Sequence, residues 1–152
     1  MSVSYISDSC CGFEEVGSIQ IKYNIPSATQ LTYHDNPGQY FSGKSCTAYL
    51  PNNEAGKDLL KRLEYAFMHG LTFTVGTSVT SGRANQCTWA SIHHKTSKVG
   101  GVKYHGFPDP DFFLNCNEEL DSLCVPPASD LDYDGTEFVS AYKNLLSSIN
   151  NP

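Results

Sequence analysis

The spacing of apolar residues changes along this chain, and that change constrains the fold more than any other sequence feature. Residues 18–25 alternate apolar and polar side chains, which predicts a half-buried β-strand that ends at Pro26. Residues 59–67 instead repeat apolar side chains at helical spacing, between a helix-start signal at residues 51–54 and a stop signal at Gly70. A chain with both periods predicts a fold that combines strands and helices.

The second half of the chain predicts a pair of strands followed by another helix. Residues 71–75 and about 86–92 alternate as strands do, and the short loop between them favours an antiparallel pair. Asp109 is expected to cap a helix whose first residue is Pro110. The buried stripe of that helix is expected to consist of Phe112, Phe113, Cys116, Leu120 and Leu123.

We therefore predict an α+β fold: a single compact domain with a mostly antiparallel sheet and two main helices. An extra C-terminal amphipathic helix is expected at about residues 136–149, where apolar side chains again share one face. The domain is expected to span residues 17–125, after a flexible lead-in at residues 1–16. Residues 126–152 are expected to form an acidic linker and the C-terminal helix.

Composition excludes several functional classes. The formal charge of −6 and the isoelectric point near 5.2 argue against a broad surface for nucleic acid or anionic membranes. No apolar stretch approaches membrane-spanning length, and the first residues lack the features of a signal peptide. The six cysteines form no C-x-x-C pair. We therefore expect reduced thiols rather than a zinc site, in a cytoplasmic or nuclear protein.

Polar residues in and around the second predicted helix stand out as candidates for chemistry. His93 and His94 follow a strand, where neighbours point to opposite sides, and His105 lies in a loop rich in glycine and proline. Glu119 lies at the edge of the apolar helix stripe. A carboxylate that loses hydration binds a proton more readily, so Glu119 is a candidate general base. The alternatives are a glutamate that reaches solvent or a lysine, and histidines that are structural or merely exposed.

The loop between the two predicted strands is a candidate site for an anionic ligand. It offers backbone N–H groups and the hydroxyls of Thr77, Ser78 and Thr80, and Arg83 lies at its exit. It lacks the Gly-Lys-Ser/Thr ending of a P-loop, and the alternative is an ordinary hairpin connection. Trp89 on the next strand is either a core residue or a surface on which a base stacks.

Two other kinds of site suit the residue types but not their spacing. The histidines and Glu119 lack an H-E-x-x-H or comparable arrangement, so no metal site is expected. Cys87 lies in the middle of a strand and Cys116 in the middle of a helix. A buried thiol in such a place is more often inert than catalytic, which argues against a Cys–His protease.

Several longer motifs resemble the C-terminal domain of the deltex family of ubiquitin ligases. Two of them are Ile92-His93-His94-Lys95-Thr96 and His105-Gly106-Phe107-Pro108-Asp109-Pro110. Others lie at residues 21–26, residues 49–54 with Gly56, residues 73–78, Trp89 and Glu119-Leu120. The resemblance covers about residues 17–125.

The resemblance implies an α+β domain with a cleft for ADP-ribose or NAD+, which act as ligand or substrate rather than as a prosthetic group. In the family, a RING domain recruits a ubiquitin-charged E2, and the C-terminal domain presents a ribose hydroxyl to the ubiquitin thioester. Carried over, Glu119 would be the general base and His105 would lie at the reacting hydroxyl. The ligand would be contacted by His93, His94, Thr77, Ser78, Thr80, Arg83, Trp89, Gly106 and Phe107.

Two departures from the family pattern shape the functional expectation. Only Cys10 and Cys11 precede the matching stretch, and a RING needs paired zinc ligands. We therefore expect the RING to be supplied in trans; the alternative is that this chain is one piece of a larger protein. Val79 stands where a small polar residue is expected in the ligand loop. The alternatives to an E3 ubiquitin transferase are a non-catalytic reader of ADP-ribosylated targets and a protein-interaction scaffold. A role in Notch signalling is implied by the resemblance alone.

Overall fold

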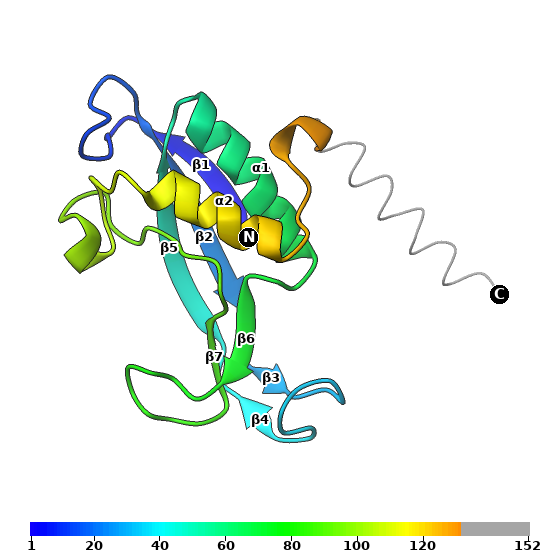
Figure 1. The fold of residues 1–152 in the computed structure, drawn as a ribbon. Helices are drawn as coiled ribbons and strands as arrows, with labels where there is room; N and C mark the ends of the chain where they lie inside the picture. Colours follow the sequence, from blue (N-terminus) through cyan, green and yellow to red (C-terminus); the bar gives the residue numbers. More distant parts are fainter. Residues whose placement is uncertain (132–152) are drawn as a thin grey trace.

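The alternating segment forms the centre of a three-stranded antiparallel sheet in the computed structural model, which describes residues 1–131 (Figure 1). Strand β2 (Ser18–Ile25) pairs with β1 (Ser2–Ile6) on one side and with β5 (Lys44–Pro51) on the other. Alternate residues of β2 are buried in the core, as the period of two predicts. These residues are Ile19, Ile21 and Tyr23.

Helix α1 (Glu54–Met68) begins and ends close to the predicted signals. The Asn53 side chain caps it by accepting a hydrogen bond from the backbone N–H of Gly56 at 2.8 Å. Gly70 follows the helix with a φ of 71°, a left-handed conformation that favours glycine. The apolar face packs into the core through Leu59, Leu60, Leu63 and Ala66.

Two small antiparallel sheets lie at the end of the molecule away from the helices (Figure 1). One pairs β6 (Phe73–Gly76) with β7 (Gln86–Trp89), as predicted, although both strands are shorter than expected. The other pairs β3 (Ala28–Thr29) with β4 (Tyr40–Phe41), inside a stretch that carried no strand signal. Strand β7 ends at Trp89, and the chain then continues to His93 in the predicted site.

Helix α2 (Phe112–Ser122) carries Glu119, and a buried arginine on α1 fixes α2 from behind. Arg62 is 4% exposed. Its guanidinium donates to the Asn117 side chain and to the Asp121 carboxylate, both at 2.6 Å. It also donates to the carbonyls of Val125 at 2.8 Å and Pro126 at 3.0 Å. The single-turn helices η1 (Val102–Tyr104) and η2 (Ala128–Asp130) flank α2 along the chain.

Two expectations are corrected. Residues 1–16 are not simply a flexible lead-in, because Ser2–Ile6 form an edge strand whose side chains are mostly exposed and therefore leave little apolar pattern. The second helix begins at Phe112 and not at Pro110. Residues 110 and 111 form a turn before the helix, in which the Asp109 carboxylate accepts the backbone N–H of Asp111 at 3.2 Å and also pairs with Lys95 at 2.5 Å.

The predicted helix at residues 136–149 lies outside the described residues. No helix within residues 1–131 has the length and apolar character needed to cross a membrane.

Candidate functional site

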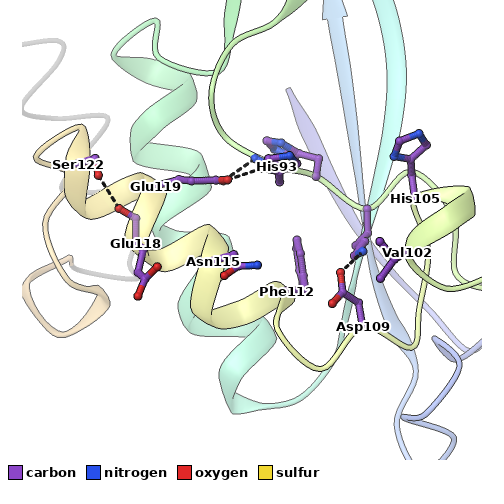
Figure 2. A pocket seen from close by; sticks show the side chains of 11 residues that line it. His93, Val102, His105, Asp109, Phe112, Asn115, Glu118, Glu119 and Ser122 are labelled. Carbon is purple, nitrogen blue, oxygen red and sulfur yellow. Dashed lines mark hydrogen bonds and ion pairs between the residues drawn. The ribbon is translucent and has the colours of Figure 1, made fainter.

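A cavity of about 600 Å³ lies between α2, the loop after β7 and the loop that precedes α2 (Figure 2). Its volume falls in the range of small-molecule sites, roughly 300–1,000 Å³. It brings together the three residues that the sequence singled out, from three separate segments. The lining residues are His93, His94, Lys95, Val102, His105, Asp109, Phe112, Asn115, Glu118, Glu119 and Ser122.

Glu119 and His93 form the most closely connected pair of the cavity. One carboxylate oxygen of Glu119 accepts the backbone N–H of His93 at 2.8 Å, and the other contacts Nδ1 of the His93 ring (Figure 2). The side chain of His93 is 80% exposed, whereas that of Glu119 is 22% exposed. The His93 ring can therefore turn towards a ligand while the backbone N–H still holds Glu119.

The thiol of Cys116 on α2 contacts the main chain of His93. Cys116 Sγ donates to the His93 carbonyl at 3.5 Å. Burial raises the pKa of this thiol to about 12, with the nearby Glu119 carboxylate adding to the effect, so it remains a neutral donor. Cys116 therefore positions the main chain of His93 and is a poor nucleophile.

His105 lies at the rim of the cavity in an unusual backbone conformation (Figure 2). Its φ of 55° is in the left-handed region, which costs a residue with a Cβ on the order of 1 kcal/mol. Its carbonyl accepts the backbone N–H of Ser97 at 3.2 Å, while its side chain is exposed. The backbone is thus fixed and the imidazole is free to meet a ligand. Strained residues of this kind cluster at functional sites.

His94 is mainly a structural residue, although it reaches the cavity wall. Its Nδ1 donates to the Ile92 carbonyl at 3.0 Å, and because a carbonyl only accepts, Nε2 must accept the Tyr23 hydroxyl at 2.8 Å. The ring stacks on Trp89 with centroids 4.4 Å apart. Burial lowers the pKa of His94 to about 4, so the ring is neutral near pH 7.

Lys95 and Asp109 form a second pair in the cavity wall. Lys95 Nζ donates to Asp109 at 2.5 Å, and the two side chains are only 7% and 15% exposed. This hydrogen bond holds the pKa of the Asp109 carboxyl below its ordinary value. The ammonium also lies 5.3 Å from the centre of the Phe112 ring, within cation–π range.

Gly106 and Phe107 lie behind the cavity wall and do not line it. Phe107 is fully buried in the core. A Cβ on Gly106 would lie 1.9 Å from the Val99 carbonyl oxygen, so only glycine fits where the two segments cross. Both residues shape the loop that presents His105.

The other predicted ligand contacts are not among the residues that line this cavity. Thr77, Ser78, Thr80 and Arg83 belong to the β6–β7 connection, and Trp89 packs between Phe73 and His94. None of these five residues lines the cavity. The prediction that they contact a ligand remains a prediction.

Sequence reasoning missed the polar face that α2 turns to the cavity. Glu118 and Glu119 each lie three or four residues from Asn115 and from Ser122, which places the four residues on one side of the helix. That spacing was the available signal. Among residues 1–131, no group of three or more histidine, cysteine, aspartate or glutamate residues is arranged to hold a metal ion.

A second cavity, of about 460 Å³, provides a contrast near β6. It is lined by apolar and aromatic residues with His34 and two threonines, and by no aspartate, glutamate, lysine or arginine. None of the predicted site residues lines it. The first cavity is therefore the candidate functional site.

A known protein family matches most of this chain. The family described as Deltex C-terminal domain matches residues 1–125. The chain belongs to the deltex C-terminal domain family. The match begins at the first residue and not at residue 17, which agrees with the position of β1 in the sheet.

Similar proteins bear the names of deltex ubiquitin ligases. The chain is 44% identical over 108 residues to the probable E3 ubiquitin-protein ligase DTX3 of Homo sapiens, covering 71% of this chain and 31% of that protein. It is 37% identical over 131 residues to the E3 ubiquitin-protein ligase DTX1 of Homo sapiens, covering 85% and 21%. The E3 ubiquitin-protein ligase DTX4 of Mus musculus is 36% identical over 122 residues, with 79% and 20% covered. This deltex domain thus spans less than a third of each relative.

Proposed function

We propose that the cavity between α2 and the two histidine loops binds ADP-ribose or NAD+ and presents a ribose hydroxyl for ubiquitin transfer from an E2 thioester. The observation that carries this proposal is the convergence of His93, His105 and Glu119 on one cavity. The ubiquitin-charged E2 and a RING domain would act in trans. The names of the relatives, which are E3 ubiquitin-protein ligases, support the assignment to ubiquitin transfer.

The proposed reaction uses Glu119 as the group that accepts a proton. The ribose oxygen attacks the thioester carbonyl of ubiquitin, its proton passes to the Glu119 carboxylate, and a C–O ester bond forms. The C–S bond breaks, and the E2 cysteine leaves as a thiolate. A hydroxyl is a poor nucleophile until its proton is removed, and a positioned base supplies about 10²–10⁴-fold in rate.

The two exposed histidines have complementary roles in this proposal. The ring of His93 turns from Glu119 to hold the nucleotide, which frees one carboxylate oxygen for the hydroxyl. His105 donates to or orients the reacting hydroxyl from the rim of the cavity. The ADP-ribose is either free or attached to a protein or nucleic acid, in the cytoplasm or nucleus.

A reconstituted transfer assay tests this function. The protein is mixed with ubiquitin-charged E2, a RING-containing ligase fragment and ADP-ribose, and the product is a ubiquitin ester that hydroxylamine cleaves. We expect Glu119→Ala to lower the rate at least about 100-fold. The control is Glu15→Gln, an exposed carboxylate outside the cavity, which should transfer at the wild-type rate. Wild-type transfer by Glu119→Ala would contradict the catalytic role.

A non-catalytic reader is the second candidate function. It is favoured by one observation: both carboxylate oxygens of Glu119 contact His93, so Glu119 also serves to hold the binding loop. Calorimetry with ADP-ribose separates the two candidates. A reader binds ADP-ribose and loses binding in His93→Ala, but yields no ester under any condition. Absence of heat with both ADP-ribose and NAD+ would exclude both functions.

A further inference from the structure

His93 and His105 lie on different loops, and neither belongs to a helix or strand. The segment between β7 and η1 carries His93, and the segment between η1 and α2 begins with His105. A hydroxyl can react only if both rings keep their places relative to Glu119. Misplacement of reacting groups by about 1 Å can lower a rate about 100-fold. The contacts between the two loops therefore matter for the site.

One side chain pair joins the two loops within the cavity wall. Lys95 lies two residues after His93, and Asp109 lies four residues after His105. Their ion pair at 2.5 Å is largely shielded from water, since Lys95 is 7% and Asp109 15% exposed. Shielding makes the attraction stronger and the geometry more rigid than in a surface pair. A backbone hydrogen bond from Ser97 to His105 at 3.2 Å runs alongside it.

The same pair connects the central sheet with the start of α2. The Lys95 carbonyl accepts the backbone N–H of Tyr49 on β5 at 2.8 Å. Asp109 accepts the backbone N–H of Asp111 at 3.2 Å, next to the first turn of α2. Glu119 on α2 accepts the backbone N–H of His93 at 2.8 Å. These contacts form a closed frame around the cavity, with the Glu119–His93 contact on one side and the Lys95–Asp109 contact on the other (Figure 2).

We propose that the Lys95–Asp109 ion pair is a positioning device that sets the place of His105 relative to His93 and Glu119. The expected effect on transfer rests on the proposed function, whereas the effect on the position of His105 does not. Lys95 and Asp109 act through the two loops and touch no reacting atom. The Lys95 charge is already matched by Asp109. Removal of the ion pair should therefore affect the rate of transfer more than the affinity for the nucleotide.

The test compares a double variant with a surface control. Lys95→Met alone would leave an uncompensated buried carboxylate, so Lys95→Met is combined with Asp109→Asn to remove both charges. Lys98→Met is the control because Lys98 pairs with Asp8 at 3.0 Å outside the cavity, with side chains 24% and 75% exposed. Lys95→Arg, with Asp109 unchanged, keeps the ion pair and should therefore transfer faster than the double variant. Circular dichroism establishes that each variant is folded.

Steady-state transfer kinetics give the first readout. We expect kcat to fall about 100-fold in the double variant, with KM for ADP-ribose changed less than about threefold. Lys98→Met should match the wild type. An unchanged kcat in the folded double variant would overturn the positioning role. A decrease in kcat of the double variant no larger than the decrease in Lys98→Met would overturn it as well.

Amide hydrogen exchange, followed by NMR, gives a readout that needs no activity. The Ser97 amide, which bonds to His105, should exchange at least about tenfold faster in the double variant, whereas the Gly56 amide at the start of α1 should not change. If the wild type neither binds ADP-ribose nor transfers ubiquitin, the proposed function fails. The exchange rate at Ser97 then decides the positioning claim by itself, and an unchanged rate overturns it.

Discussion

At one end of β7 the chain bonds mainly to itself, whereas at the other end it bonds to the sheet and to α2. In the β6–β7 loop, Ser78 donates its N–H to Arg83 at 2.9 Å, and Gly82 donates to Ser78 at 2.8 Å. The loop after β7 instead contacts β5 through Lys95 and α2 through His93. Both loops were predicted to contact a ligand, but only the second lines the candidate cavity.

The difference separates two ways of building a binding site. Groups that must react with one another need fixed positions, and tertiary contacts supply these at the His93 loop. A segment that bonds mainly to itself, as residues 78–83 do, can adapt to a ligand, but it loses conformational freedom when it binds. We therefore expect substitutions after β7 to affect both stability and transfer, and substitutions in the β6–β7 loop to affect binding alone.

The largest difference is expected between two glycines: Gly76, where β6 ends and the β6–β7 loop begins, and Gly106, which packs against the loop after β7. An added Cβ at Gly106 would lie 1.9 Å from the Val99 oxygen, and at Gly76 it would meet nothing within 4 Å. Gly106→Ala should lower the free energy of unfolding by about 3 kcal/mol or more, because backbone must move. Gly76→Ala should change it by less than about 0.5 kcal/mol. Urea unfolding followed by circular dichroism measures both, and equal effects would contradict the comparison.

The buried imidazole after β7 predicts an acid-sensitive contribution to stability. The pKa of His94 in the folded state is about 4, below the ordinary value of 6.5. The unfolded chain therefore binds the proton more readily than the folded one. The stabilisation by the neutral ring is complete above pH 6.5 and is lost as the pH falls towards 4. Between about pH 7 and pH 4.5 the loss should be roughly 2 kcal/mol.

Replacing the imidazole isolates this contribution. His94→Gln should lower stability near pH 7, since the contacts with Tyr23 and Trp89 are lost, but should show a smaller decline on acidification. Urea unfolding at several pH values gives the difference between the two curves. His34→Gln, in the stretch between β3 and β4, serves as the control and should decline as steeply as the wild type. A parallel decline in His94→Gln would show that His94 is not responsible.

The smallest effects are expected in the β6–β7 loop. Val79 is fully exposed, and Arg83 is exposed as well. Val79→Ser and Arg83→Ala should each leave the free energy of unfolding within about 0.5 kcal/mol of the wild type. Calorimetry with ADP-ribose should show whether they alter binding: we expect a few-fold gain for Val79→Ser and a few-fold loss for Arg83→Ala. Unchanged affinity in both variants would remove this loop from the proposed site.

Local patterns predicted the elements more reliably than their ends or partners. The period of 3.6 residues and the Asn53 cap gave α1 almost its full length, because both signals act within one helix. Strand β1 was missed since it is held at the sheet edge by backbone pairing with β2, which leaves little trace in its own side chains. The start of α2 was misplaced by two residues, because residues 110 and 111 form a turn, and the pairing of Asp109 with Lys95, 14 residues away in the chain, left no local signal.

The sequence by itself determined the α+β class, the family and three chemically suitable side chains, because periodicity and motifs are properties of neighbouring residues. Only the tertiary structure decided which of those side chains meet. Glu119 and His93 are 26 residues apart in the chain and are in contact, whereas the neighbouring His94 turns to Tyr23, 71 residues away. Such contacts depend on how α2 and the sheet pack around one core, and no local spacing encodes that packing.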